Sequence, residues 1–161
     1  MKSSRSKPRK VAIALEMHWG HKRHQETYAG CLNYANEAGW NCVITPHSER
    51  VRHPQKNEHP FDGVRARASK SMAQTANKLG LPIVNVWLNS PASQVPSVLP
   101  DFEESGRIAA KHLMSRGFKR FGYLGYHRDL DAKRQNEGFR SILESKGFNC
   151  TTHRFSRTSM E

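Results

Sequence analysis

The sequence predicts an α/β protein in which parallel strands are connected by helices. Short apolar runs with β-branched residues alternate with stretches whose apolar residues recur at helical spacing. Several helical stretches are followed by a glycine, the residue that most easily takes the left-handed conformation at a helix end. Strands that alternate with helices in this way form right-handed β–α–β units and a parallel sheet.

The part of the chain before residue 89 is expected to alternate between strand and helix. A helix at residues 24–38 carries an apolar face and stops at Gly39. A helix at residues 70–79 has Ser69 as its N-terminal cap. Strands are predicted at residues 11–15, 40–45, 62–68 and 82–87, and a polar loop at residues 47–60.

A proline-rich loop at residues 89–100 interrupts this alternation and indicates the passage to a second subdomain. After it, Asp101 and Glu104 form a capping-box pattern that begins a helix ending before Gly117. The rest of the chain is expected to form a strand, a helix and a strand at residues 119–125, 131–146 and 148–153.

The chain is strongly basic. Its 161 residues contain 26 Lys and Arg against 14 Asp and Glu, a formal net charge of +12. This charge favours polyanions, so non-specific nucleic-acid binding is one hypothesis, with residues 1–10 as a basic disordered tail. No apolar run suits a membrane span or a signal peptide, which predicts a cytoplasmic protein without membrane contact. Cys31, Cys42 and Cys150 form no CxxC pair and are expected to be reduced thiols.

Catalytic motifs are missing from the sequence. It contains no GxSxG, GxxxxGK(S/T) or HExxH pattern. His18, His21 and His24 recur at intervals of three, but no carboxylate or cysteine stands at a matching spacing, so no metal site is expected. A small flavodoxin-like nucleotide-binding protein or enzyme is an alternative, although residues 16–20 lack the glycines of a phosphate loop. We therefore expect a binding protein without catalysis or cofactor.

The expected carboxyl ends of the strands are rich in aromatic and hydrogen-bonding side chains. They include Glu16, His18 and Trp19 after the first strand, and Trp87 and Tyr126 after later ones. Parallel sheets bind ligands at this edge. Aromatic faces suit the CH groups of a sugar, and polar side chains bond its hydroxyls. These residues indicate a small polyhydroxylated ligand.

Sequence blocks in a fixed order carry the most specific signal. They are Val11-Ala-Ile-Ala-Leu15, Lys22-Arg-His24, Tyr28-Ala-Gly30, Phe61-Asp-Gly-Val64, Arg67-Ala68, Leu81-Pro-Ile-Val-Asn-Val-Trp87, Gly106-Arg-Ile-Ala-Ala-Lys-His-Leu113, Arg116-Gly-Phe118, Phe121-Gly-Tyr-Leu-Gly125 and Gly138-Phe139. In this order and spacing, residues 10–155 resemble the sugar-sensing module of XylR-type xylose operon regulators, transcription regulators of the AraC family. That module is similar to the lac and purine repressors, and the resemblance implies the fold of type I periplasmic binding proteins.

The resemblance implies two hinged lobes, residues 11–100 and an incomplete second lobe at 101–161, with a xylose-like sugar in the cleft between them. The side chains that would hold the sugar are Glu16, His18, Trp19, Arg23, His24, Trp87, Tyr126, Arg134 and Gln135. In the related repressors an arginine three residues before the Gly-Phe pair holds the effector. In this sequence that position is Gln135, and Arg134 precedes it.

Regulation of transcription is the function that the resemblance implies. Closure of the lobes on the sugar would reposition a DNA-binding domain, and we expect that domain to be absent from these 161 residues. DNA would therefore be a partner only through the missing domain. Incomplete sheets leave exposed edge strands, which predicts a homo-oligomer.

Overall fold

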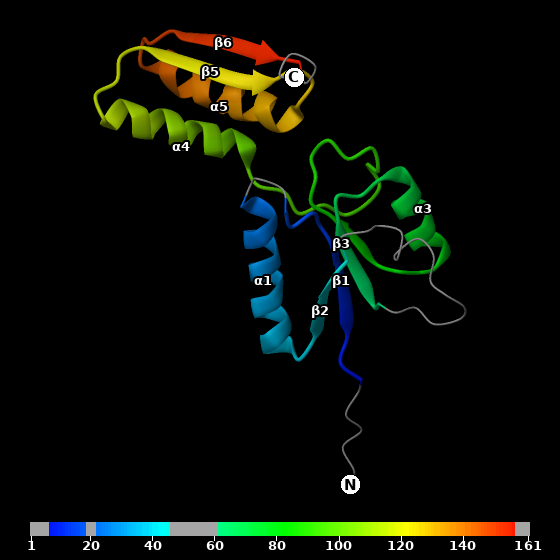
Figure 1. Ribbon diagram of the computed structural model, residues 1–161. Coiled ribbons are helices and arrows are strands. Elements are labelled where there is room, and N and C mark those ends of the chain that lie inside the picture. The colour runs from blue at the N-terminus through cyan, green and yellow to red at the C-terminus, as the bar shows by residue number, and fades with distance from the viewer. Residues whose placement is uncertain (1–6, 19–21, 46–60, 157–161) are drawn as a thin grey trace. The chain divides into compact units, whose positions relative to one another are not determined.

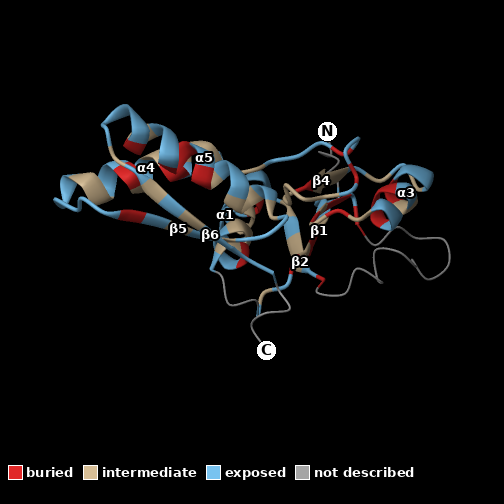
Figure 2. Ribbon diagram, turned by 90° about the horizontal axis from the view of Figure 1, so that it is seen from above, coloured by how far each residue is buried: buried red, intermediate tan, exposed pale blue. Residues whose placement is uncertain are grey.

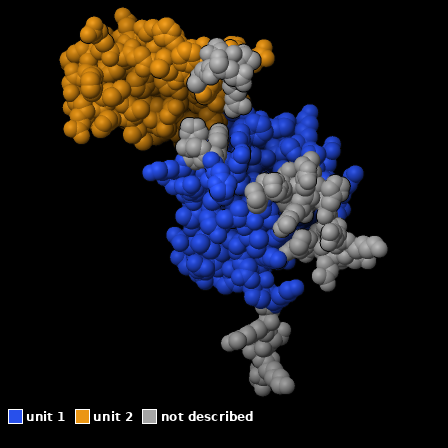
Figure 3. Space-filling model, viewed as in Figure 1, with its two compact units in different colours: residues 1–98 blue, residues 99–161 orange. Residues whose placement is uncertain are grey.

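The computed structural model describes residues 7–18, 22–45 and 61–156 of the chain. Most of the basic tail expected at residues 1–10, and the loop expected at 47–60, lie outside the described residues. The chain separates into two compact units, unit 1 (Met1–Val98) and unit 2 (Leu99–Glu161), which Figure 3 shows in different colours.

Unit 1 contains a four-stranded parallel sheet with the order β2-β1-β3-β4. Its strands are β1 (Lys10–Ala14), β2 (Asn41–Ile44), β3 (Gly63–Ala66) and β4 (Ile83–Asn85). Helix α1 (Arg23–Ala38) follows β1, and helix α3 (Lys70–Lys78) follows β3. Figure 1 shows the two helices on opposite sides of the sheet. The predicted alternation of strand and helix is confirmed.

Helix α1 ends, and helix α3 begins, where the sequence predicts. Gly39 follows α1 with φ 68°, a left-handed conformation in which a residue with a side chain would be strained. The hydroxyl of Ser69 accepts a hydrogen bond from the main-chain N of Met72 and so caps α3.

The core of unit 1 lies where small and branched side chains of the sheet meet α3. Ala12, Val64, Ala66 and Met72 are buried there together with Phe61. Burial of this apolar surface is the main force that holds the sheet and the helix together. Figure 2 shows buried segments running through the strands of this unit.

Strand β4 is shorter than the predicted strand at residues 82–87. The side chain of Asn85 forms hydrogen bonds with both main-chain polar groups of Trp87. It accepts from the main-chain N at 3.0 Å and donates to the main-chain O at 2.8 Å. Because Trp87 bonds to a side chain, it is withdrawn from the strand ladder.

Unit 2 contains helix α4 (Phe102–Ser115), strand β5 (Phe121–Tyr126), helix α5 (Leu130–Ser145) and strand β6 (Cys150–Phe155). Strands β5 and β6 pair in parallel. Both helices lie on one side of this pair (Figure 1). Their shared core consists of Ala110, Phe121, Phe139 and Leu143.

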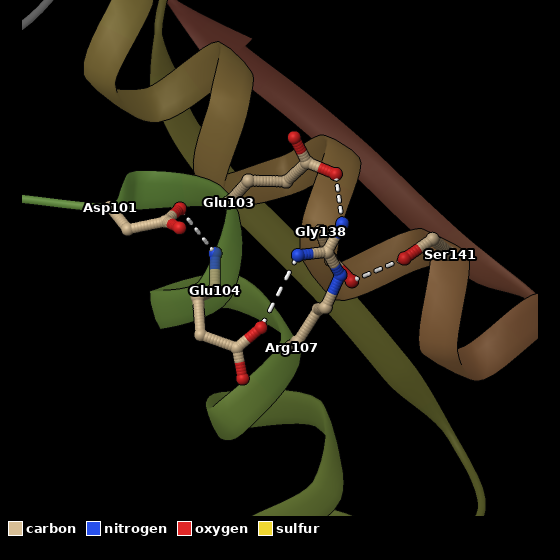
Figure 4. A network of polar contacts seen from close by, with 6 residues as sticks. All are labelled: Asp101, Glu103, Glu104, Arg107, Gly138 and Ser141. Atoms are coloured by element: carbon tan, nitrogen blue, oxygen red, sulfur yellow. Dashed lines mark hydrogen bonds and ion pairs between the residues drawn. The ribbon is translucent and has the colours of Figure 1, made fainter.

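Helix α4 begins at the capping box that the sequence predicts. The carboxylate of Asp101 accepts a hydrogen bond from the main-chain N of Glu104 at 2.8 Å. Arg107, one turn further along, pairs with the carboxylates of Glu103 and Glu104. Figure 4 shows this network on the first two turns of the helix.

Helix α5 begins at Leu130, one residue before the predicted start. Asp129 is its N-terminal cap, since its carboxylate accepts from the main-chain N of Asp131 at 3.0 Å. Arg128, just before the cap, has φ 63°, the left-handed region that side chains other than glycine rarely occupy.

Candidate functional site

The order of strands in unit 1 defines where a ligand would bind. The connection from β1 leads to one neighbour, β2, while β3 lies on the other side of β1. In open parallel sheets, ligands bind outside the carboxyl ends of the strands at such a reversal of order. The residues that follow β1, β3 and β4 are therefore the candidate site of this unit.

Asn85 organises this carboxyl edge. Its side chain is 3% exposed. In addition to the two bonds with Trp87, its Oδ1 accepts from the main-chain N of Ala68 at 3.2 Å and its Nδ2 donates to the hydroxyl of Ser97 at 2.9 Å. One buried amide thus fixes the residues that follow β3 and β4 relative to each other, because all of its hydrogen-bonding groups are used.

Trp87 and Arg67 form a cation–π pair at the same edge. The Arg67 guanidinium carbon lies 4.6 Å from the centroid of the Trp87 ring. A guanidinium over an aromatic face is attracted by the negative potential of the ring. The pair places a positive charge next to an apolar surface.

The loop after β1 holds further predicted ligand residues. The Glu16 and His18 side chains are exposed, and Arg23 is the first residue of α1. The ring of His24 is 4% exposed, and its Nδ1 is bonded to the main-chain O of Glu16 at 2.7 Å. His24 therefore joins the start of α1 to the end of β1. Trp19 lies outside the described residues.

Unit 2 contains a small pocket at the carboxyl ends of β5 and β6, next to the start of α5. Its volume is about 50 Å³. The side chains and main chain around it include two tyrosines, three cations, one carboxylate and one amide; the lining residues are Tyr123, Gly125, Tyr126, Arg128, Asp129, Leu130, Ala132, Lys133, Asn136 and Arg154. The pocket combines tyrosine residues with hydrogen-bonding groups, and its volume is well below the roughly 300 Å³ at which small-molecule sites begin.

Asn136 lies at the buried side of this pocket. Its residue surface is 5% exposed, and its Oδ1 has no hydrogen-bond partner within residues 7–18, 22–45 and 61–156. Its Nδ2 lies 3.5 Å from the hydroxyl of Thr152. A buried amide oxygen without a donor costs free energy, on the order of 1–3 kcal/mol. A ligand hydroxyl in the pocket would remove this cost.

The structure separates the three predicted ligand residues of unit 2. Tyr126 lines the pocket and is 42% exposed. Arg134 is exposed on α5 and does not line the pocket. Gln135 connects three elements, since its Oε1 accepts from the Tyr123 hydroxyl at 3.0 Å and its Nε2 donates to the Ser105 hydroxyl at 3.2 Å.

Tyr123 remains a donor over a wide pH range. Burial raises the pKa of its hydroxyl, and the nearby carboxylate of Asp129 raises it further. Burial also raises the pKa of the Cys42 and Cys150 thiols, with Cys31 adding to the effect at Cys42. Both thiols are therefore protonated and weakly nucleophilic at neutral pH.

Asn136 was not among the predicted site residues, although the sequence pattern around it marks it out. Asn136, Phe139 and Leu143 stand at the spacing of one helix face, and the latter two belong to the core. A polar residue inside an apolar stripe is either bonded or placed at a site, because burial without a partner is costly. Lys133 and Arg154 gave no such signal, since charged residues are common on exposed surfaces.

Within residues 7–18, 22–45 and 61–156, no three His, Cys, Asp or Glu side chains gather in an arrangement that could hold a metal ion. In the same residues, no helix has the length and apolar character needed to cross a membrane. Cys31, Cys42 and Cys150 are free thiols.

The comparison with solved structures gives a consistent result. A periplasmic binding protein/LacI transcriptional regulator from Alkaliphilus metalliredigens, complexed with D-xylulofuranose, has a TM-score of 0.64 and 14% identity over 91% of this chain and 56% of that chain. The Cra transcriptional dual regulator from Pseudomonas putida, in complex with fructose 1-phosphate, has a TM-score of 0.64 and 17% identity over 93% and 58%. A CelR–cellobiose complex has a TM-score of 0.64 and 20% identity over 91% and 50%.

The fold is that of LacI and periplasmic-binding-protein-like domains. The predicted fold class is confirmed. The chain spans about half the length of these structures. No family model matches the sequence. No curated protein matches it either. The similarity therefore lies in how the backbone is arranged, at sequence identities of 14% to 20%.

Proposed function

We propose that the chain is a sugar-sensing module of a transcription regulator, a binding protein without catalysis. The observation that carries the proposal is the pocket of unit 2 at the carboxyl ends of β5 and β6, whose lining residues include two tyrosines and Asn136, a buried amide. An aromatic surface beside a buried acceptor without a donor suits a hydroxylated ring. The solved structures of the same fold support the proposal, since three of them carry sugars or a sugar phosphate.

The finer parts of the proposal follow from the sequence resemblance. Unit 1 and unit 2 correspond to the two lobes of the sensor, with Arg67 and Trp87 as the ligand surface of unit 1. Glu16, His18 and Arg23 would extend that surface. The ligand would be a pentose of the xylose type, and the regulator would be XylR-like, of the AraC family, and cytoplasmic. DNA contact would belong to another domain of the regulator.

Calorimetry with the full 161-residue chain tests this proposal. We expect heat of binding from one or more members of a panel of pentoses and hexoses, and none from ATP, NAD or FMN. Binding of a nucleotide but no sugar would favour the flavodoxin-like alternative and overturn the proposal. Silence from every sugar would also overturn it.

A pair of matched variants tests the site itself. Asn136→Ala removes the buried acceptor and should weaken sugar binding by about tenfold, the effect of losing one good hydrogen bond. Asn149→Ala changes an exposed amide of the same unit that does not line the pocket and should leave the affinity unchanged. Equal affinities for the two variants would show that the pocket is not the sugar site. Circular dichroism of both variants controls for folding.

A further inference from the structure

The pocket of unit 2 is surrounded by more positive than negative charge. Arg128, Lys133 and Arg154 are among its lining residues, whereas Asp129 is the one lining carboxylate. The three cations come from different elements: the loop after β5, the first turns of α5, and β6. Because they converge from separate elements, the positive charge is a property of the pocket rather than of one helix face.

Two of these cations have no ion-pair partner among the residues that the structure describes. Within the described part of the chain, neither Arg128 nor Arg154 forms an ion pair. Lys133 has a single long contact, with Nζ 3.9 Å from a carboxylate oxygen of Glu137. Elsewhere in unit 2, Arg107 and Arg140 each meet a glutamate carboxylate on their own helix.

The lining carboxylate is already engaged. Asp129 caps α5 through the main-chain N of Asp131, so its negative charge is placed at the positive end of the helix dipole. Arg128 is held next to it in a left-handed backbone conformation, φ 63°. A non-glycine residue in that conformation is strained, and such strain is frequent where a side chain is positioned for a ligand.

The second independent observation is the buried Oδ1 of Asn136. It is an acceptor on a residue that lines the pocket, and it has no donor among the described residues. An anion alone would not satisfy it, because an anion has no proton to give. A hydroxyl group would satisfy the amide oxygen, while an anionic group on the same molecule would pair with the arginines.

We propose that the ligand of this pocket is a sugar that carries an anionic group, either a phosphate or a carboxylate. The inference rests on the proposed sugar-sensing function and specifies its substrate class. The ring would lie at Tyr126 and a hydroxyl at Asn136. The anionic group would be bound by Arg128 and Arg154, with Lys133 adding a third charge.

Calorimetry with matched probes tests the proposal on the full chain. The probes are D-xylose, D-glucuronate, which is the D-xylose ring with a carboxylate at C5, and D-xylose 5-phosphate. We expect one anionic probe to bind at least about tenfold more tightly than D-xylose, as charge-assisted bonds to arginine predict. The two anionic arms identify phosphate or carboxylate as the preferred group. Added salt should reduce the difference, because the arginines are solvent-accessible.

Substitutions of single arginines test which side chains produce the preference for the anionic probe. Arg128→Gln and Arg154→Gln should each remove most of the preference for the anionic probe over D-xylose. Arg120→Gln changes an exposed arginine of unit 2 that does not line the pocket, and should keep the preference.

Failure of this inference and failure of the proposed sugar-sensing function give different binding results. Binding of D-xylose as tight as that of both anionic probes would overturn the inference and leave the sugar-sensing function standing. Failure of all sugars, charged and neutral, would overturn the sugar-sensing function itself. Inorganic phosphate that binds as tightly as the sugar phosphate would show a plain anion site and would also overturn the inference.

Discussion

Gly106 on α4 faces the main-chain oxygen of Gln135 on α5, and a Cβ atom at Gly106 would overlap with it. A second contact of this kind stands nearby, where a Cβ atom at Gly138 on α5 would overlap with the main-chain oxygen of Glu103 (Figure 4 shows both residues). The two glycines allow the helix backbones to approach closely. This approach brings Ser105 of α4 within reach of Gln135.

Gly106→Ala and Gly138→Ala should therefore each destabilise unit 2, by about 2 kcal/mol or more, because main chain cannot give way as a flexible side chain can. Gly30→Ala is the matched control, since Gly30 lies inside α1 with no atom within 4 Å of an added Cβ. It should raise stability by roughly 0.5–1 kcal/mol. The measurement is urea unfolding followed by circular dichroism.

Tryptophan fluorescence makes this test specific to one unit. Trp19, Trp40 and Trp87 all belong to unit 1. Gly106→Ala should shift the circular-dichroism transition and leave the fluorescence midpoint in place. A Gly106 variant as stable as the Gly30 variant would contradict the close contact of the helices.

Asn85→Ala should destabilise unit 1 by about 2–3 kcal/mol. The substitution leaves the main-chain groups of Ala68 and Trp87 buried without their partner, and such losses cost more than the hydrogen bonds themselves contribute. Ser97→Ala removes one of the four bonds and should cost roughly 0.5–1.5 kcal/mol. Fluorescence-detected unfolding measures both. Equal effects would mean that Asn85 does not organise the carboxyl edge.

Tyr123→Phe should make the stability of unit 2 less sensitive to alkaline pH. In the folded state burial, and then Asp129, raise the pKa of the Tyr123 hydroxyl above its ordinary value of 10.0. The stabilisation from the neutral hydroxyl is complete below that ordinary value and is lost as the pH rises through the raised pKa. The wild type should thus lose its advantage over Tyr123→Phe at strongly alkaline pH, as measured by urea unfolding at a series of pH values.

The same variant has an expected effect at neutral pH. It loses the hydrogen bond to Gln135, at a cost of roughly 0.5–1.5 kcal/mol. Tyr34→Phe, at a tyrosine that is 59% exposed in unit 1, is the control and should be neutral. A difference between wild type and Tyr123→Phe that stays constant up to strongly alkaline pH would argue against the raised pKa.

Self-association should depend on the uncovered face of β5 and β6. Leu124 and Phe155 are 67% and 42% exposed there, and apolar strand surface promotes pairing with other chains. Leu124→Lys should lower the average mass measured by light scattering. Ile108→Lys, at a residue of α4 that is 58% exposed, should leave it unchanged. A wild type that stays monomeric at all concentrations would disprove the expected homo-oligomer.

The sequence predicted several helix ends correctly, where residues close by in the chain determine them. Gly39 ends α1, Ser69 caps α3 and Asp101 caps α4, and each acts through bonds or conformations within a few residues of its own position. The end of β4 was predicted two residues too late, because it depends on Asn85 turning its side chain onto Trp87. No periodicity of the sequence reports such a bond.

The candidate site was predicted only in part, because its geometry also depends on contacts between distant residues. The sequence directed attention to the carboxyl ends of the strands, and Trp87 and Tyr126 lie there. It did not show that His24 and Gln135 are engaged in bonds within their own units, nor that Arg128 and Arg154 meet at one pocket. Arg128 and Arg154 are far apart in the chain, and the pairing of β5 with β6 brings them together.

The sequence by itself determined the alternation of strands and helices, the helix ends and the excess of positive charge, since propensity, capping and composition act locally or as sums. Only the tertiary structure decided which polar groups are buried without partners and where charges gather. Both depend on the register of β5 with β6 and on the packing of α5 against them, and these are set by contacts between distant residues.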